Sequence, residues 1–288
     1  MADKNRAINR VFTKGVISDL LEKGHNDVFD FVVRKYVDEP QGLTHGELIS
    51  EIYAYLKREQ RNEYYYQNTL LKKLLDGVHS VNTTTALSQV RIGRSVADLV
   101  MINGDGIVYE IKSELDNFDR LEYQLHDYYQ AFSKTVVVVP ISSFDRVNAV
   151  LNGFKGIKGF AGVYAITEQN TLSNRYRIEP KQNNACLSHT AVFKLLRKRE
   201  YETVLLKYFG NLPKCDQVFH FRVCQKCFES IPMETAQKLA YAELRKRNSI
   251  TKDCFTSINT ELKSVVYFSN LSSKMPALEK LLETQYGR

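Results

Sequence analysis

Three charged side chains interrupt two apolar runs between residues 97 and 112, a segment that reads ADLVMINGDGIVYEIK. Asp98 lies in the first run, and Glu110 and Lys112 lie two residues apart in the second. Charged groups inside strands this apolar are costly unless they are paired or hold a metal ion. Two carboxylates could bind Mg²⁺ or Mn²⁺, and the lysine could stabilise negative charge that develops on a phosphate. The simpler interpretation is an ion pair between Glu110 and Lys112, and spacing alone does not choose between the two.

The turn inside this segment decides whether the two acids can meet. The tetrapeptide NGDG at residues 103–106, between two apolar runs, predicts a β-hairpin. Side chains on paired strands share a face only when they lie opposite one another or two residues apart. We therefore expect an odd-length loop or a bulge, because a regular four-residue loop would put Asp98 and Glu110 on opposite faces. In that register the main-chain carbonyl of Ile111 could add a metal ligand.

The elements that must position these residues can be predicted from apolar periodicity and turn signals. Residues 1–58 are predicted to form short helices, with a capping box at Thr44 and Glu47; a helix-turn-helix and a small helical packing module are both compatible with them. Residues 59–182 alternate strands and helices, and residues 183–288 return to helix. We expect an α/β fold with a mixed sheet, with strands near 86–92, 97–102, 107–111, 134–140, 160–166 and 172–178 and helices near 116–132 and 144–151.

Taken with this order of elements, the residues around the hairpin resemble the PD-(D/E)XK nuclease superfamily. Asp98 stands where the first acid of the motif is expected, and Glu110-Ile111-Lys112 matches its E-x-K half. The segment QLHDY at residues 124–128 is similar to the Q-x-x-x-Y motif of RecB-type members, and residues 109–116 are similar to a stretch shared by a family of bacterial proteins. The resemblance implies a restriction-endonuclease-like mixed β-sheet core flanked by helices, with helical N-terminal and C-terminal regions. It also implies a Mg²⁺- or Mn²⁺-dependent hydrolase that cleaves phosphodiester bonds in DNA.

The resemblance assigns a role to each motif residue. Asp98, Glu110 and the carbonyl of Ile111 are implied to hold the metal, and Lys112 is implied to act at the phosphate. On the following helix, spacing puts two polar residues on one face with a basic residue one turn earlier. Their implied role is to contact the substrate phosphate, and they are Gln124, Tyr128 and Arg120.

Two further positions bear on the number of acids. Members of the superfamily often carry another acid on the helix before the three strands, where this chain has Glu63, with Glu59 in reserve. Some also carry an acid on the strand before the hairpin, where this chain has Gln89. The amide motivates an alternative function, in which a catalytically inactive nuclease fold serves as a DNA-binding regulator or assembly module.

Composition limits the other functional classes. The chain has a formal net charge of +7, and its densest basic segments lie at residues 194–199 and 245–247. This charge permits a nucleic-acid partner without demanding one, and leaves RNA open beside DNA. No apolar run is long enough to span a bilayer and no signal peptide is evident, so we expect a cytoplasmic protein without a membrane partner. A homodimer is also compatible with the sequence.

The five cysteines all lie in the C-terminal part, at positions 186, 215, 224, 227 and 254. An odd number in this distribution does not fit a secreted disulfide framework. Cys224 and Cys227 have the spacing of a zinc knuckle, and Cys215 and His220 could complete four ligands, with Cys254 as another candidate. Reduced cysteines without a metal are the simpler interpretation.

Overall fold

The computed structural model describes residues 6–59, 61–78, 80–114, 116–248 and 250–287. Contacts group the chain into two compact units: unit 1 comprises Met1–Val81 and Ile250–Arg288, and unit 2 comprises Asn82–Ser249. The ranges expected from the sequence, 1–58, 59–182 and 183–288, divide the chain at other points. The difference arises because the segment after residue 250 packs with the N-terminal helices, and because residues 59–81 belong to that same unit.

Unit 1 is helical. The predicted capping box is confirmed, since the Thr44 N–H donates to Glu47 Oε2 at 2.7 Å and the Glu47 N–H donates to Thr44 Oγ1 at 3.2 Å. The helices of this unit are α1 (Arg6–Val11), α2 (Lys14–Lys23), α3 (Asp27–Tyr36), α4 (His45–Glu59), α5 (Glu63–Lys72), α12 (Lys252–Ser257), α13 (Lys263–Phe268) and α14 (Met275–Glu283), with shorter helical turns at η1 (Lys73–Val78), η4 (Thr260–Leu262) and η5 (Leu271–Lys274).

A buried asparagine joins the two chain segments of unit 1. Asn68 on α5 is 1% exposed. Its Nδ2 donates to the Thr260 carbonyl at 2.8 Å, and its Oδ1 accepts the Ser264 N–H at 2.8 Å. Tyr64 adds a third link, because its hydroxyl donates to the Glu261 carbonyl at 2.6 Å. These bonds satisfy polar groups that burial would otherwise leave unpaired.

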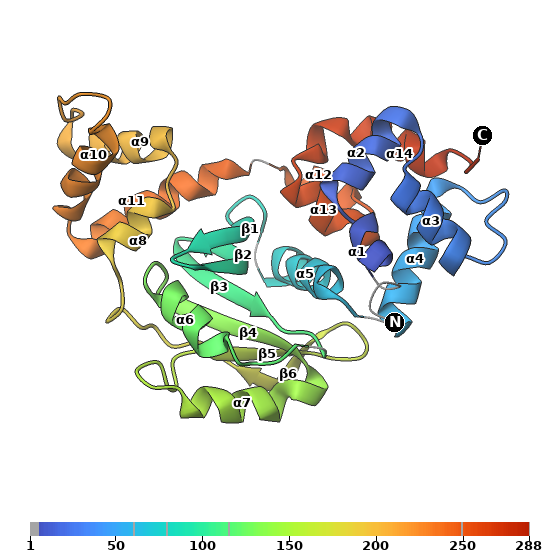
Figure 1. Cartoon of the computed structure of the whole chain (residues 1–288), viewed down its shortest axis with the longest axis horizontal. Helices are drawn as coiled ribbons and strands as arrows, with labels where there is room; N and C mark the ends of the chain where they lie inside the picture. The colour runs from blue at the N-terminus through green and yellow to red at the C-terminus, as the bar shows by residue number, and fades with distance from the viewer. Residues whose placement is uncertain (1–5, 60, 79, 115, 249, 288) are drawn as a thin grey trace. The chain divides into compact units, whose positions relative to one another are not determined.

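Unit 2 is built on a six-stranded sheet with the strand order β1-β2-β3-β4-β5-β6. The strands are β1 (Thr85–Ile92), β2 (Ser95–Asn103), β3 (Asp105–Ile111), β4 (Lys134–Pro140), β5 (Gly162–Ile166) and β6 (Leu172–Ile178). The pairs β3–β4 and β4–β5 are parallel, and the other neighbours are antiparallel. Helix α6 (Leu121–Tyr129) connects β3 to β4, and α7 (Phe144–Gly153) connects β4 to β5 (Figure 1). The predicted α/β fold, a mixed sheet flanked by helices with helical N-terminal and C-terminal regions, is confirmed.

One core packs the helices of unit 2 against the sheet. Val137 and Val139 of β4 belong to it with Leu125 of α6 and Val147 of α7. The C-terminal helices of the unit extend this core and comprise α8 (His189–Lys194), α9 (Lys198–Phe209), α10 (His220–Glu229) and α11 (Met233–Leu244), followed by the turn η3 (Arg245–Arg247). No helix among the described residues is long and apolar enough to cross a membrane.

Helix α6 is shorter than the helix predicted for residues 116–132. Asp116 does not start it, because its Oδ2 accepts the N–H and the hydroxyl of Ser113, both at 2.7 Å, and closes a turn. The helix begins at Leu121. The shorter helix still carries the two polar residues of the Q-x-x-x-Y motif.

Candidate active site

The β2–β3 hairpin has the register that the two acids require. Asn103 pairs with Asp105 around Gly104, so the turn has an odd length. Gly104 has a φ of +75°, a conformation that glycine adopts without strain. Following this register along the strands places Asp98 opposite Glu110. The predicted odd-length loop is therefore confirmed, and both carboxylates share one face of the sheet.

Glu110 lies at the centre of a network of hydrogen bonds. It is only 2% exposed, and both of its carboxylate oxygens are engaged. Its Oε1 accepts from Lys112 Nζ at 2.8 Å and from Gln124 Nε2 at 2.5 Å, and its Oε2 accepts from the Tyr128 hydroxyl at 2.6 Å. Lys112 Nζ also donates to Gln124 Oε1 at 2.9 Å. The structure thus joins the E-x-K residues to the two Q-x-x-x-Y residues on α6.

Burial keeps the Tyr128 hydroxyl protonated. Loss of solvent raises the pKa of Tyr128 well above its usual value, and the nearby Glu110 carboxylate raises it further. The same oxygen lies 2.9 Å from the Val96 carbonyl. A neutral hydroxyl donates to the carboxylate without repelling it, so Tyr128 fixes the orientation of Glu110.

Asp98 is held from the neighbouring strand. The described pairing of β2 with β3 ends at Leu99 and Tyr109. One step further along, Asp98 Oδ2 accepts the Ile111 N–H at 2.8 Å. The half-buried Asp98 side chain therefore continues the link between the two strands where their described ladder stops.

Gln89 lies opposite Asp98 on the other side. The neighbours of Gln89 on β1 pair with the neighbours of Asp98 on β2. Gln89 has a φ of +53°, a left-handed conformation that costs a non-glycine residue about 1–2 kcal/mol. Such strain persists where the surroundings enforce it and is frequent at functional sites. Register thus gives the row Gln89, Asp98, Glu110 across three strands, with an amide at its first position.

Two of the predicted residues lie outside this network. Arg120 directly precedes α6 with an exposed side chain, and its carbonyl accepts the Gln124 N–H at 3.0 Å. It therefore lies one turn before Gln124, as its spacing predicted. Glu63 is the first residue of α5 in unit 1, where it is exposed. Its role as a further acid stays a prediction, since the other predicted residues belong to unit 2.

The donor set suits a hard divalent cation. Asp98 and Glu110 supply carboxylate oxygens from neighbouring strands, and oxygen ligands are the ones that Mg²⁺ and Mn²⁺ prefer. Lys112 compensates one of the two negative charges through its contact with Glu110. A negative charge in excess within a largely buried group favours binding of a cation. The residues present therefore fit the predicted metal.

Comparison with known proteins assigns the chain to a family. The family model for bacteriophage P4 protein cII matches residues 56–269, nearly three quarters of the 288-residue chain. The chain belongs to the bacteriophage P4 cII protein family. The matched range of this family contains all the candidate site residues. No curated protein and no solved structure gives a significant match.

Asp127 is a residue of this cII-family chain that the sequence analysis missed. It is buried on α6, and its Oδ2 accepts the Arg94 N–H, the Ser95 N–H and the Ser95 hydroxyl at 3.0, 2.9 and 2.8 Å. It therefore fastens the β1–β2 turn to the helix that carries Gln124 and Tyr128. The approach is so close that a Cβ on Gly93 would lie 2.6 Å from Asp127 Oδ1. An acid inside the Q-x-x-x-Y motif was visible in the sequence, but its partners 32 and 33 residues earlier were not.

Proposed function

We propose that this chain is a metal-dependent deoxyribonuclease of the PD-(D/E)XK type, which hydrolyses phosphodiester bonds. The observation that supports this best is the network on Glu110. Lys112 belongs to the E-x-K motif and Gln124 and Tyr128 to the Q-x-x-x-Y motif, and all three side chains contact the same carboxylate. Two short motifs that matched by chance would have no reason to meet at one buried group.

The chain's own residues divide the work of such a reaction. Asp98 and Glu110 would hold the metal, with the Ile111 carbonyl as a further ligand. A bound Mg²⁺ or Mn²⁺ would polarise the scissile phosphate and make a bound water a better nucleophile. Lys112 would bring its ammonium to the negative charge that develops on the phosphate.

The residues of α6 would position these groups and receive the substrate. Gln124 contacts both Lys112 and Glu110, so it keeps the ammonium beside the carboxylate. Tyr128 orients Glu110 from the other side. Arg120, exposed one turn before Gln124, is placed for contact with a DNA phosphate. The net charge of +7 supports a polyanionic substrate.

Cleavage of supercoiled plasmid and of end-labelled single-stranded DNA with Mg²⁺ or Mn²⁺ tests the proposal, and labelled RNA tests the choice of nucleic acid. We expect cleavage by the wild type, which EDTA abolishes, and at least a hundredfold slower cleavage by Glu110→Gln and Lys112→Met. Preparations of these variants also reveal any contaminating nuclease. Cleavage by either variant at the wild-type rate would show that the site is not catalytic.

Glu179 offers a matched control for the acid. Its carboxylate accepts from the Tyr164 hydroxyl at 2.6 Å and from Arg177 Nε at 2.5 Å, so it also pairs with a tyrosine and a cation. It follows β6, at the other end of the sheet order from β1. Glu179→Gln should cleave DNA as fast as the wild type, and a loss equal to that of Glu110→Gln would mean that the effect is not specific to the site.

Gln89 supports a second candidate function, a nuclease fold without catalysis that binds DNA as a regulator or assembly module. An amide in the row with Asp98 and Glu110 reduces the number of carboxylates available to a metal. This candidate predicts salt-dependent DNA binding without cleavage, and no heat of Mg²⁺ binding in calorimetry. The substitution Gln89→Glu would then strengthen metal binding, whereas the first candidate requires measurable binding by the wild type.

A further inference from the structure

Helix α10 presents three metal-ligating side chains on one face. His220, Cys224 and Cys227 are spaced by four and three residues, so they lie one above the other along the helix. Cys224 is fully buried and Cys227 is half-buried. All three lie within unit 2, away in sequence from the carboxylates of the candidate active site.

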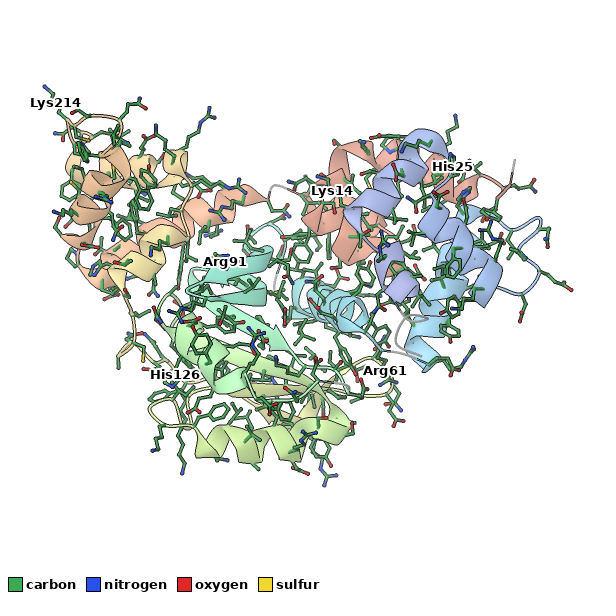
Figure 2. All side chains as sticks on the ribbon, in the orientation of Figure 1. Lys14, His25, Arg61, Arg91, His126 and Lys214 are labelled. Carbon is green, nitrogen blue, oxygen red and sulfur yellow. The ribbon has the colours of Figure 1, made fainter. Side chains whose placement is uncertain are left out.

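The loop between α9 and α10 brings a fourth such side chain to this face. Cys215 Sγ lies 3.9 Å from His220 Nδ1, and Cys224 Sγ lies 3.5 Å from His220 Nε2. Zinc in a tetrahedral site, with Zn–S bonds of about 2.3 Å and Zn–N bonds of about 2.0–2.1 Å, separates its sulfur and nitrogen ligands by about 3.6 Å. The observed separations are close to this value. Figure 2 shows Lys214, the neighbour of Cys215, on this loop.

Cys227 completes the group. Burial raises the pKa of the Cys224 thiol to about 11, and the next two causes are the neighbouring Cys215 and Cys227. The three sulfur atoms are thus close enough to interact. All of them are free thiols. The four side chains together have the composition of a Cys₃His zinc site.

A carboxylate on α9 sets the state of the imidazole. Glu202 Oε1 lies 2.8 Å from His220 Nε2, which places the ring proton on Nε2 and leaves a lone pair on Nδ1, beside Cys215. Histidine ligands of zinc commonly donate their second nitrogen to a carboxylate in this way. Glu202 therefore has the position of an outer-shell partner.

The loop has few apolar anchors of its own. It runs through residues 210–219 without helix or strand, and it ends at Val218 and Phe219, which are 85% and 52% exposed. Leu212 packs partly against the core. A segment that buries so little apolar surface gains order from a metal that ties it to the adjacent helix.

We propose that Cys215, His220, Cys224 and Cys227 bind one zinc ion, which fastens the 210–219 loop to α10. Thiolate and imidazole ligands favour zinc over the Mg²⁺ expected at the carboxylates. Four protein ligands leave no open position, so the site is structural. The donors lie on both edges of the imidazole, and side-chain rotation of the cysteines brings them around a single ion.

The metal content of the full chain tests this site. We expect one zinc per chain by mass spectrometry after purification from zinc-supplemented medium and washing with a weak chelator. Cys215→Ser and Cys227→Ser should each lower this content at least fivefold, whereas Cys186→Ser and Cys254→Ser, at cysteines outside the group, should retain it. A wild type without zinc, or equal loss in all four variants, would overturn the proposal.

Two further variants separate ligation from folding and from the proposed nuclease. His220→Cys supplies a fourth thiolate and should retain zinc, whereas His220→Ala should lose it. Co²⁺ added to the metal-free chain should give the intense bands of thiolate ligation in the wild type and weaker ones in Cys227→Ser. Glu110→Gln should leave the zinc content unchanged, so the zinc site can be present even if the nuclease proposal fails. Loss of zinc in Glu110→Gln, or unaltered Co²⁺ bands in Cys227→Ser, would contradict the assignment.

Discussion

The Tyr128 hydroxyl lies 2.6 Å from Glu110 Oε2, so α6 and β3 share a short hydrogen bond in a buried setting. The substitution Tyr128→Phe removes the donor and leaves the carboxylate oxygen with one partner fewer. We expect the free energy of unfolding to fall by about 1–3 kcal/mol, measured by urea denaturation. Tyr123→Phe, at an exposed position of the same helix, should change it by less than about 0.5 kcal/mol. Equal stability of the two variants would show that the bond does not stabilise the fold.

The raised pKa of Tyr128 makes stability depend on pH in the alkaline range. In the unfolded chain tyrosine ionises near pH 10, whereas in the folded chain burial and the Glu110 carboxylate hold Tyr128 protonated to higher pH. Above pH 10 the unfolded state therefore binds fewer protons, and the contribution of Tyr128 to stability, complete below that pH, declines as pH rises. The difference in unfolding free energy between wild type and Tyr128→Phe should shrink by about 1 kcal/mol between pH 10 and 11. A constant difference would contradict this.

Glu110 and Lys112 should depend on each other for stability. Their side chains are only 3% and 12% exposed, and loss of one partner leaves the other charge largely buried. Lys112→Met should cost about 3–5 kcal/mol, and the double variant Glu110→Gln/Lys112→Met should cost clearly less than the two single changes added together. The exposed pair Glu234 and Lys238 on α11 gives the matched cycle, where we expect a coupling of about 0.3–0.5 kcal/mol. Similar coupling in the two cycles would refute the argument.

Asp127 should matter for the geometry of the site without contacting its reactive groups. Asp127→Asn weakens the bonds to Arg94 and Ser95, and we expect a loss of about 1–3 kcal/mol in unfolding free energy. The amide protons of both residues should exchange faster with solvent, which NMR or mass spectrometry can follow. Asp119→Asn, at an exposed position before α6, serves as the control. Unchanged exchange at Arg94 and Ser95 would mean that the turn is held by other contacts.

Much of the site could be predicted because its information is local. The turn residues around Gly104 predict a hairpin, and the spacing of Asp98 and Glu110 from that turn limits their register to two classes. The spacing of Gln124 and Tyr128 likewise predicts a shared helix face. The sequence could not choose the register class, because an odd-length turn and a four-residue loop both fit the same glycines.

The remaining features depend on partners that are distant in the chain. Asn68 receives the Ser264 N–H from 196 residues away, and no periodicity indicates such a partner. This contact is why α5 belongs to unit 1 and not to the range predicted for the nuclease-like core. The position of Asp127 against the β1–β2 turn was missed for the same reason. Gln89 was correctly seen as an amide in place of an acid, but its left-handed φ is a property of the folded sheet.

The bonds of Asn68 have a consequence for biosynthesis. Unit 1 needs chain from both sides of unit 2, since α5 is bonded to residues 260 and 264. During translation the whole of unit 2 leaves the ribosome before α13 is made, and domains generally fold as units during synthesis. We therefore expect unit 2 to fold first on a nascent chain, while α5 waits for its C-terminal partner. Chaperones would then meet this protein as a folded sheet domain preceded by helices that are not yet packed.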